Sequence, residues 1–184
     1  MSDVGALAAG DLSSWLATMQ AALRGEQDAD VPCGGCTACC TASQFVHIEP
    51  DETDALAHIP AELLFPAPRL PHGHVLMGYD DRGHCPMLID GQCSIYEHRP
   101  RTCRTYDCRV FPATGLAPDD DDKVQIAARA ARWHFELPGD DDRRKSDAVR
   151  AAAAFLQLQP GNRPLRSTTA LAVRAIEIHE DFLD

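Results

Sequence analysis

Apolar residues recur at helical spacing near the start of the chain. In segment 11–24, the apolar positions that share one helix face are Leu12, Trp15, Leu16, Met19 and Leu23. Asp11 or Ser13 stands where a side-chain oxygen can cap the first turn. This pattern predicts an amphipathic helix over residues 11–24. The polar segment 25–32 that follows predicts a linker.

Shorter apolar runs follow in the middle of the chain. Residues 45–48 (FVHI) predict a strand, and the acidic segment directly after Pro50 predicts a helix with a favourable first turn. Several prolines between Pro50 and Pro71 then predict irregular backbone.

A hairpin is predicted further along. The runs 86–89 and 92–96 flank Asp90-Gly91, a dipeptide whose tolerance of positive φ favours a type I′ turn. Arg99-Pro100 then predicts the start of a helical turn that carries Cys103, because proline fits the first helical position.

The last third of the chain contains no cysteine, and its pattern predicts helices. An approximate helical stripe runs through Val124, Ala127, Ala128, Ala131 and Phe135. We therefore predict a helix over 123–137, a second from the Asp140–Asp142 turn towards Pro160, and a third over 168–184. The expected fold class is α+β, with short strands and a hairpin in a small cysteine-rich module that packs against several helices. The expected domains are residues 1–30, 31–112 and 113–184.

Composition and charge narrow the class of protein. The 184 residues are 45% hydrophobic and 24% charged, as in ordinary globular proteins, and the formal net charge is −11. Such an acidic surface repels phosphate backbones and anionic lipids, which argues against nucleic acid and membrane partners. The N-terminal sequence lacks the pattern of a secretory signal, and no apolar run is long enough to span a membrane. We therefore expect a cytoplasmic protein with reduced thiols. A protein partner is possible.

Eight cysteines in two quartets are the most specific feature. The first quartet is Cys33, Cys36, Cys39 and Cys40, and the second is Cys85, Cys93, Cys103 and Cys108. A disulfide framework suits short secreted chains, whereas this chain is long enough to bury a core without covalent links. Thiolates at two-residue spacing can surround one soft metal ion or one cluster. All eight cysteines are therefore predicted to be metal ligands.

The spacing leaves two kinds of metal centre open. Cys33-Gly34-Gly35-Cys36 can form a zinc knuckle, but adjacent Cys39 and Cys40 point in different directions and fit a single zinc ion less well. The C-x2-C-x2-C run of Cys33, Cys36 and Cys39 is typical of an iron–sulfur cluster, whose fourth ligand would come from the second quartet. Spacing favours iron and keeps zinc as the alternative. Because such a cluster needs that fourth ligand, we expect the two quartets to converge in space.

Residues beside the cysteines could assist such a centre. The arginines of this stretch are Arg99, Arg101, Arg104 and Arg109. They either offset the charge of the thiolates or are solvated surface residues. His84 abuts Cys85 and is either an additional ligand or a loop histidine.

The cysteine motifs resemble one family. Its pattern is CxxCxxCC, then C-P-x-L, then C-x-I-Y-x-x-R-P-x-x-C-R-x-[FY]-x-C. The matching residues here are Cys33, Cys36, Cys39 and Cys40; Cys85, Pro86 and Leu88; and Cys93, Ile95, Tyr96, Arg99, Pro100, Cys103, Arg104, Tyr106 and Cys108. Over residues 31–112 the chain is similar to the CxxCxxCC (YkgJ-type) family of zinc- or iron-chelating domains. The resemblance implies metal binding. We expect an iron–sulfur or iron centre; the alternative is a zinc-stabilised, non-catalytic interaction or metal-handling module.

Overall fold

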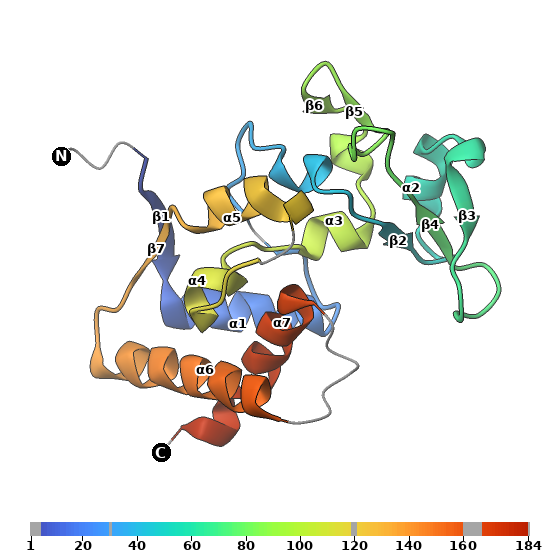
Figure 1. The fold of residues 1–184 in the computed structure, drawn as a ribbon. Helices are drawn as coiled ribbons and strands as arrows, with labels where there is room; N and C mark the ends of the chain where they lie inside the picture. The colour runs from blue at the N-terminus through green and yellow to red at the C-terminus, as the bar shows by residue number, and fades with distance from the viewer. Residues whose placement is uncertain (1–4, 30, 119–120, 160–166, 184) are drawn as a thin grey trace. The chain divides into compact units, whose positions relative to one another are not determined.

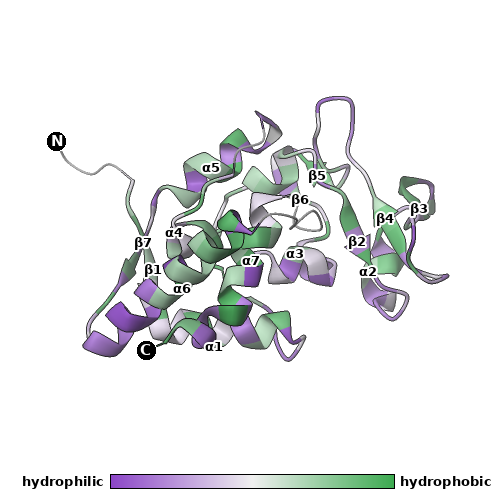
Figure 2. Cartoon of the chain, turned by 60° about the horizontal axis from the view of Figure 1, so that its bottom comes forward, coloured by the Kyte–Doolittle hydropathy of each residue, from purple (hydrophilic) through white to green (hydrophobic). Residues whose placement is uncertain are grey.

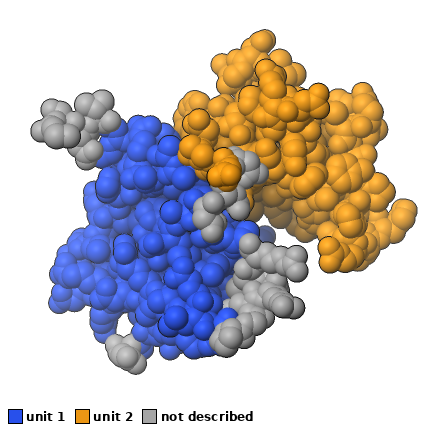
Figure 3. All heavy atoms as spheres, viewed as in Figure 1, with its two compact units in different colours: residues 1–27, 107–120, 126–184 blue, residues 28–106, 121–125 orange. Residues whose placement is uncertain are grey.

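The chain forms two compact units. Unit 1 comprises residues 1–27, 107–120 and 126–184, and unit 2 comprises residues 28–106 and 121–125 (Figure 3). The computed structural model describes residues 5–29, 31–118, 121–159 and 167–183 (Figure 1). Helices accompany short strands in small sheets, so the fold is α+β as predicted. Within the described ranges, no helix combines the length and the apolar character needed to cross a bilayer.

Unit 1 is mainly helical. Its helices are α1 (Leu12–Leu23), α4 (Val110–Thr114), α6 (Asp140–Leu158) and α7 (Thr168–Ile178), with most of α5 (Val124–Ala130). Asp11 caps α1, because its side chain accepts a hydrogen bond from Ser14 N. The predicted helices in these regions are confirmed for α1, α6 and α7. Pro160 and Asp184, where two of those predictions ended, lie outside the described residues.

Helices α6 and α7 pack through small residues. The first turns of α6 are hydrophilic and its later turns are apolar (Figure 2). Ala152, Ala153 and Leu156 of α6 meet Ala175 of α7 in one buried cluster. Alanine lets the helix backbones approach closely and carries no side-chain entropy cost. This contact gives unit 1 an apolar core of its own.

The helix predicted over 123–137 is wrong in its second half. Only α5 is helical there, and Trp133–Glu136 forms strand β7, which pairs in parallel with β1 (Leu7–Asp11). Along β7, Trp133 is buried and His134 is exposed. The ring of Phe135 lies against that of Trp15, with centroids 4.8 Å apart and planes tilted by 52°. Alternating aromatic residues favour a strand once a partner strand is available. That partner is far away in sequence, so local periodicity did not reveal it.

Unit 2 contains a small antiparallel sheet and a short helix. Strands β2 (Val46–Ile48), β4 (Val75–Met77) and β3 (Leu64–Pro66) pair in the order β2-β4-β3, and α2 spans Thr53–His58. The predicted strand at 45–48 and the helix after Pro50 are confirmed. The buried cluster of this unit comprises Val46, Ile48, Ala55, Ile59, Met77, Met87 and Ile95.

The predicted hairpin and helical turn are also present in unit 2. Strands β5 (Leu88–Ile89) and β6 (Gln92–Cys93) pair antiparallel. Their turn places Asp90 at φ 50° and Gly91 at φ 75°, the two positive angles that a type I′ turn needs. The 3-10 turn Tyr96–His98 follows, and α3 (Arg101–Thr105) begins after Pro100 and carries Cys103.

Candidate metal centre

Backbone hydrogen bonds shape the first cysteine block and join it to the second. Cys36 N donates to Cys33 O at 3.0 Å across a turn in which Gly34 adopts φ 56°. Cys39 and Cys40 lie in the 3-10 turn Ala38–Thr41. Cys85 N donates to Cys40 O at 2.7 Å. This bond places the start of the second block directly beside the end of the first.

Seven of the eight cysteines line one pocket of unit 2. They are Cys33, Cys36, Cys39, Cys40, Cys85, Cys93 and Cys103. The pocket volume is about 300 Å³. The predicted convergence of the two blocks is therefore confirmed for these seven residues. No disulfide forms among the eight cysteines, all of which are described.

Cys108 is placed differently. It belongs to unit 1, is 7% exposed and is not among the residues that line the cysteine pocket. Trp133 Nε1 lies 3.3 Å from its Sγ and donates a hydrogen bond to it. The structure therefore brings seven of the predicted ligands together and gives the eighth a partner inside unit 1.

Burial and mutual repulsion act on the pocket thiols. Burial, followed by the nearby Cys85, Cys93 and Cys36, raises the pKa of the Cys40 thiol to about 11. Burial, followed by Cys85, Cys40 and Cys93, raises the pKa of the Cys103 thiol to about 12. Burial also raises the pKa of Cys85. Ionising several of these thiols together is costly unless a cation lies among them.

One of the four arginines singled out in the sequence lines this pocket. Arg99 lowers the pKa of both the Cys40 and the Cys103 thiols, against the larger effect of burial. Its Nε donates to Tyr96 O at 2.8 Å, and its guanidinium carbon lies 3.7 Å from the centre of the Tyr96 ring. These contacts hold the charge in place beside the thiols.

The other three arginines have acidic partners. Arg101 pairs with Glu49 at 2.6 Å, and Arg104 pairs with Asp28 at 3.2 Å. Arg109 lies in unit 1, where it forms a buried ion pair with Asp107 at 2.8 Å. Arg99 is therefore close to the cysteines in the sequence and also acts electrostatically on the pocket thiols.

The donors of the pocket fit a soft metal. A zinc ion with four thiolates, at a Zn–S distance of about 2.3 Å, would separate their sulfurs by about 3.8 Å. Among the described residues, no three cysteine sulfurs lie within 4.8 Å of one another. Apolar side chains, including Met77, Met87 and Ile95, complete the walls. The donor chemistry fits thiolate-bound zinc or iron.

Sequence reasoning missed a group of other metal-binding side chains in unit 2. The structure brings together Asp54, His58 and His98, whereas His84 is not in this group and does not line the cysteine pocket. The i,i+4 spacing of Asp54 and His58 on a predicted helix is the sequence signal that could have drawn attention to them.

The fold and the pocket define a class of cysteine-based metal-chelating proteins. A family model for CxxCxxCC, described as "Putative zinc- or iron-chelating domain", matches residues 32–130. Because the match covers more than half of the chain, the protein belongs to this family. No curated protein and no solved structure matches the chain.

Proposed function

We propose that this protein holds an iron–sulfur centre, or an iron centre, in the cysteine pocket of unit 2. The observation that carries the proposal is the arrangement of seven cysteines around one pocket of about 300 Å³. A cluster distributes its thiolate ligands over different iron atoms and therefore spaces them further apart than one ion does. Seven thiol donors exceed the four that one tetrahedral ion takes, and this surplus supports such a polynuclear centre.

The electrostatic couplings suggest which cysteines act together. Cys103 is influenced by Cys85, Cys40 and Cys93, and Cys40 is influenced by the same Cys85 and Cys93. These four side chains provide one thiolate from the first block and three from the second. Cys33, Cys36 and Cys39 retain the C-x2-C-x2-C spacing that suits three corners of a cluster. The proposed ligand set is thus the seven pocket cysteines, without Cys108.

The surroundings have distinct roles in this proposal. Iron held by thiolates supplies electron-transfer chemistry. Arg99 offsets part of the negative charge of the thiolates, and its contacts with Tyr96 fix it there. Met77, Met87 and Ile95 restrict the access of water to the sulfurs. The hydrogen bond from Cys85 N to Cys40 O holds the two blocks in register.

Anaerobic purification tests the proposal. We expect a brown protein with broad visible absorption, and with iron and acid-labile sulfide in stoichiometric amounts. Iron without sulfide would support a mononuclear or diiron thiolate site. Colourless protein with stoichiometric zinc would overturn the proposal in favour of the zinc-stabilised module. The full chain should be analysed directly after purification, because later exposure to air destroys many clusters.

A further inference from the structure

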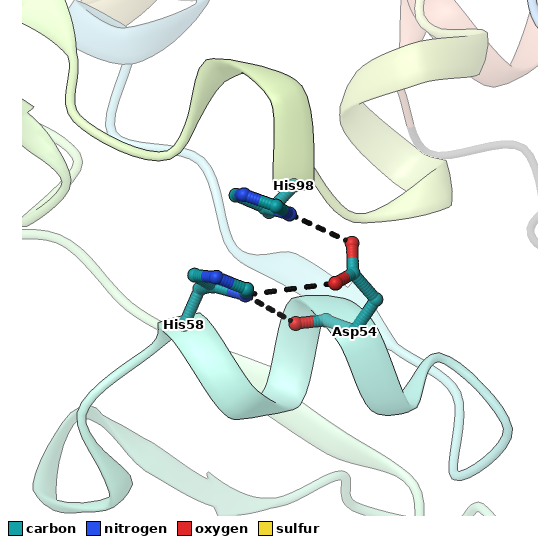
Figure 4. A group of neighbouring side chains, drawn as sticks. All are labelled: Asp54, His58 and His98. Carbon is teal, nitrogen blue, oxygen red and sulfur yellow. Dashed lines mark hydrogen bonds and ion pairs between the residues drawn. The ribbon is translucent and has the colours of Figure 1, made fainter.

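Two histidine rings and one carboxylate meet on unit 2, outside the cysteine pocket. Asp54 and His58 lie on α2, and His98 ends the 3-10 turn Tyr96–His98 (Figure 4). The rings of His58 and His98 stack with centroids 3.5 Å apart and planes 4° apart. His98 Nδ1 lies 2.9 Å from Asp54 Oδ2, and His58 Nδ1 lies 3.7 Å from Asp54 Oδ1. Both rings therefore turn the same edge towards one carboxylate.

The stacked rings are open to solvent. A neutral imidazole is a common ligand for transition metals. The side chains of His58 and His98 are 40% and 39% exposed, so an ion can reach them from solvent.

The distances are close to those of a metal site. One ligand atom from each of the three residues lies within 4.8 Å of the others. A tetrahedral ion with bonds of about 2.0 Å holds its ligand atoms about 3.3 Å apart. The distances from the Asp54 carboxylate to the two rings, 2.9 and 3.7 Å, lie on either side of this value. His58 Nδ1 also lies 2.8 Å from Asp54 O, and an ion bound at this nitrogen would replace that contact.

We propose that Asp54, His58 and His98 form a second, solvent-accessible site for a divalent transition-metal ion of the zinc class, distinct from the cysteine pocket. Two imidazoles and one carboxylate are borderline ligands that suit Zn²⁺, Co²⁺ or Ni²⁺ rather than Mg²⁺ or Ca²⁺. Three protein ligands leave coordination positions for water. The overall negative charge of the protein favours the approach of a cation.

Two arginines near Asp54 would oppose the binding of a cation, but each has a carboxylate partner. Arg104 exerts a positive field at Asp54, but its guanidinium is paired with Asp28 at 3.2 Å. Arg101, which lines the neighbouring pocket with Asp54, is paired with Glu49 and Asp51. The positive charges of Arg104 and Arg101 are therefore compensated by carboxylates.

The simpler alternative is that these residues form only an ion pair. In that case, His98 and Asp54 would join α2 to the 3-10 turn without binding a metal. The two explanations differ in a measurable way, because only a metal site takes up an additional ion when the cysteine centre is already loaded.

Titration with Co²⁺ separates the explanations. The full chain, with its cysteine centre loaded, should retain one additional equivalent of cobalt per chain after free ion is removed. The difference spectrum should show no new thiolate-to-cobalt charge transfer, because the ligands are nitrogen and oxygen. Both His98→Gln and His58→Gln should abolish this equivalent. His72→Gln, which changes an exposed histidine outside the group, should retain it.

Circular dichroism before titration controls for folding. If His98→Gln disturbs the turn, His58→Gln still tests the proposal. The ring of His58 contacts Asp54 from within the same helix, α2. The proposal is overturned if no additional equivalent binds, or if the equivalent persists in His58→Gln. New thiolate-to-cobalt charge transfer would also overturn it, because the ion would then be at the cysteines.

Discussion

Trp133 donates its indole N–H to the sulfur of Cys108, and both residues belong to unit 1. This relationship separates Cys108 from the seven cysteines of the pocket, although all eight match the motif of one family. A buried thiol that accepts a hydrogen bond can be retained for packing alone. The ligand set can therefore be tested by comparing cysteines that the motif treats alike.

Cys103→Ser and Cys108→Ser should differ in metal content. Cys103 lines the pocket among other thiols, and a serine hydroxyl there is a far weaker ligand for a soft metal. We expect Cys103→Ser to lose most of its metal and Cys108→Ser to retain the content of the unaltered protein. Measurement of the metal content per chain distinguishes the two variants. An equal loss of metal in both variants would show that Cys108 is also a metal ligand.

Arg99→Gln should weaken metal binding. Without the guanidinium, the pKa values of Cys40 and Cys103 rise further, and more proton competition opposes the metal. We expect about a 10-fold loss of affinity, typical for residues that support metal ligands. Competition with a chelator measures the affinity for the metal. Arg101→Gln is the matched control, since Arg101 pairs with Glu49 and does not line the pocket; similar losses in both variants would contradict a specific role of Arg99.

The metal-free protein should lose stability at alkaline pH. An unfolded cysteine ionises near its ordinary pKa of 9.0, whereas folded Cys40 ionises at about 11 and folded Cys103 at about 12. The unfolded state therefore binds fewer protons between these values, and the free energy of unfolding falls as pH rises. This contribution is complete below pH 9.0 and is lost as pH rises through about 11 to 12. Urea unfolding under reducing conditions measures it.

Two comparisons make the pH prediction specific. Cys40→Ser should show a shallower loss, because one of the raised pKa values is absent. Metal-loaded protein should show no corresponding loss, because its ligand thiols are already ionised. A decline of equal slope in all three samples would mean that other groups cause it.

Metal removal should affect unit 2 before unit 1. Structural metals contribute folding energy, on the order of 10 kcal/mol in zinc-finger peptides. After chelation, we expect faster hydrogen exchange in the segments 33–40 and 85–106, and little change in α6 and α7, whose core is apolar. Mass spectrometry of exchanged peptides measures both. Equal acceleration throughout the chain would show that the two units unfold as one.

Asp107→Ala should destabilise unit 1 strongly. The Asp107 carboxylate accepts from Trp15 Nε1 at 2.7 Å and pairs with Arg109, and the two charged side chains are 1% and 7% exposed. Loss of one partner of a buried ion pair costs about 3–5 kcal/mol. Denaturant unfolding measures it. Asp140→Ala, which breaks the exposed pair with Arg143, should have a far smaller effect; equal losses would contradict the role of burial.

Local chemistry made several elements predictable. Asp11 and the apolar face behind it specify α1, and Asp90-Gly91 specifies the turn between β5 and β6. Strand β7 was not predictable in this way, because its state depends on hydrogen bonds to β1. The alanines before Trp133 extend a helical pattern, and only the distant partner changes it.

The candidate site was also predictable from the sequence only in part. The spacing of the cysteines predicted their convergence, which the structure confirms for seven of them. The position of Cys108 depends on Trp133, which no cysteine motif includes. His58 and His98 were not predicted to meet, because their contact arises from the packing of α2 against the 3-10 turn at Tyr96–His98.

The parallel pairing of Leu7 with Trp133 also determines an order of events during synthesis. Chains emerge from the ribosome N-terminus first, and domains fold as units when their residues become available. All seven pocket cysteines precede Trp133, so they have left the ribosome before β1 can find its partner. A nascent chain can thus acquire its metal while unit 1 is still incomplete.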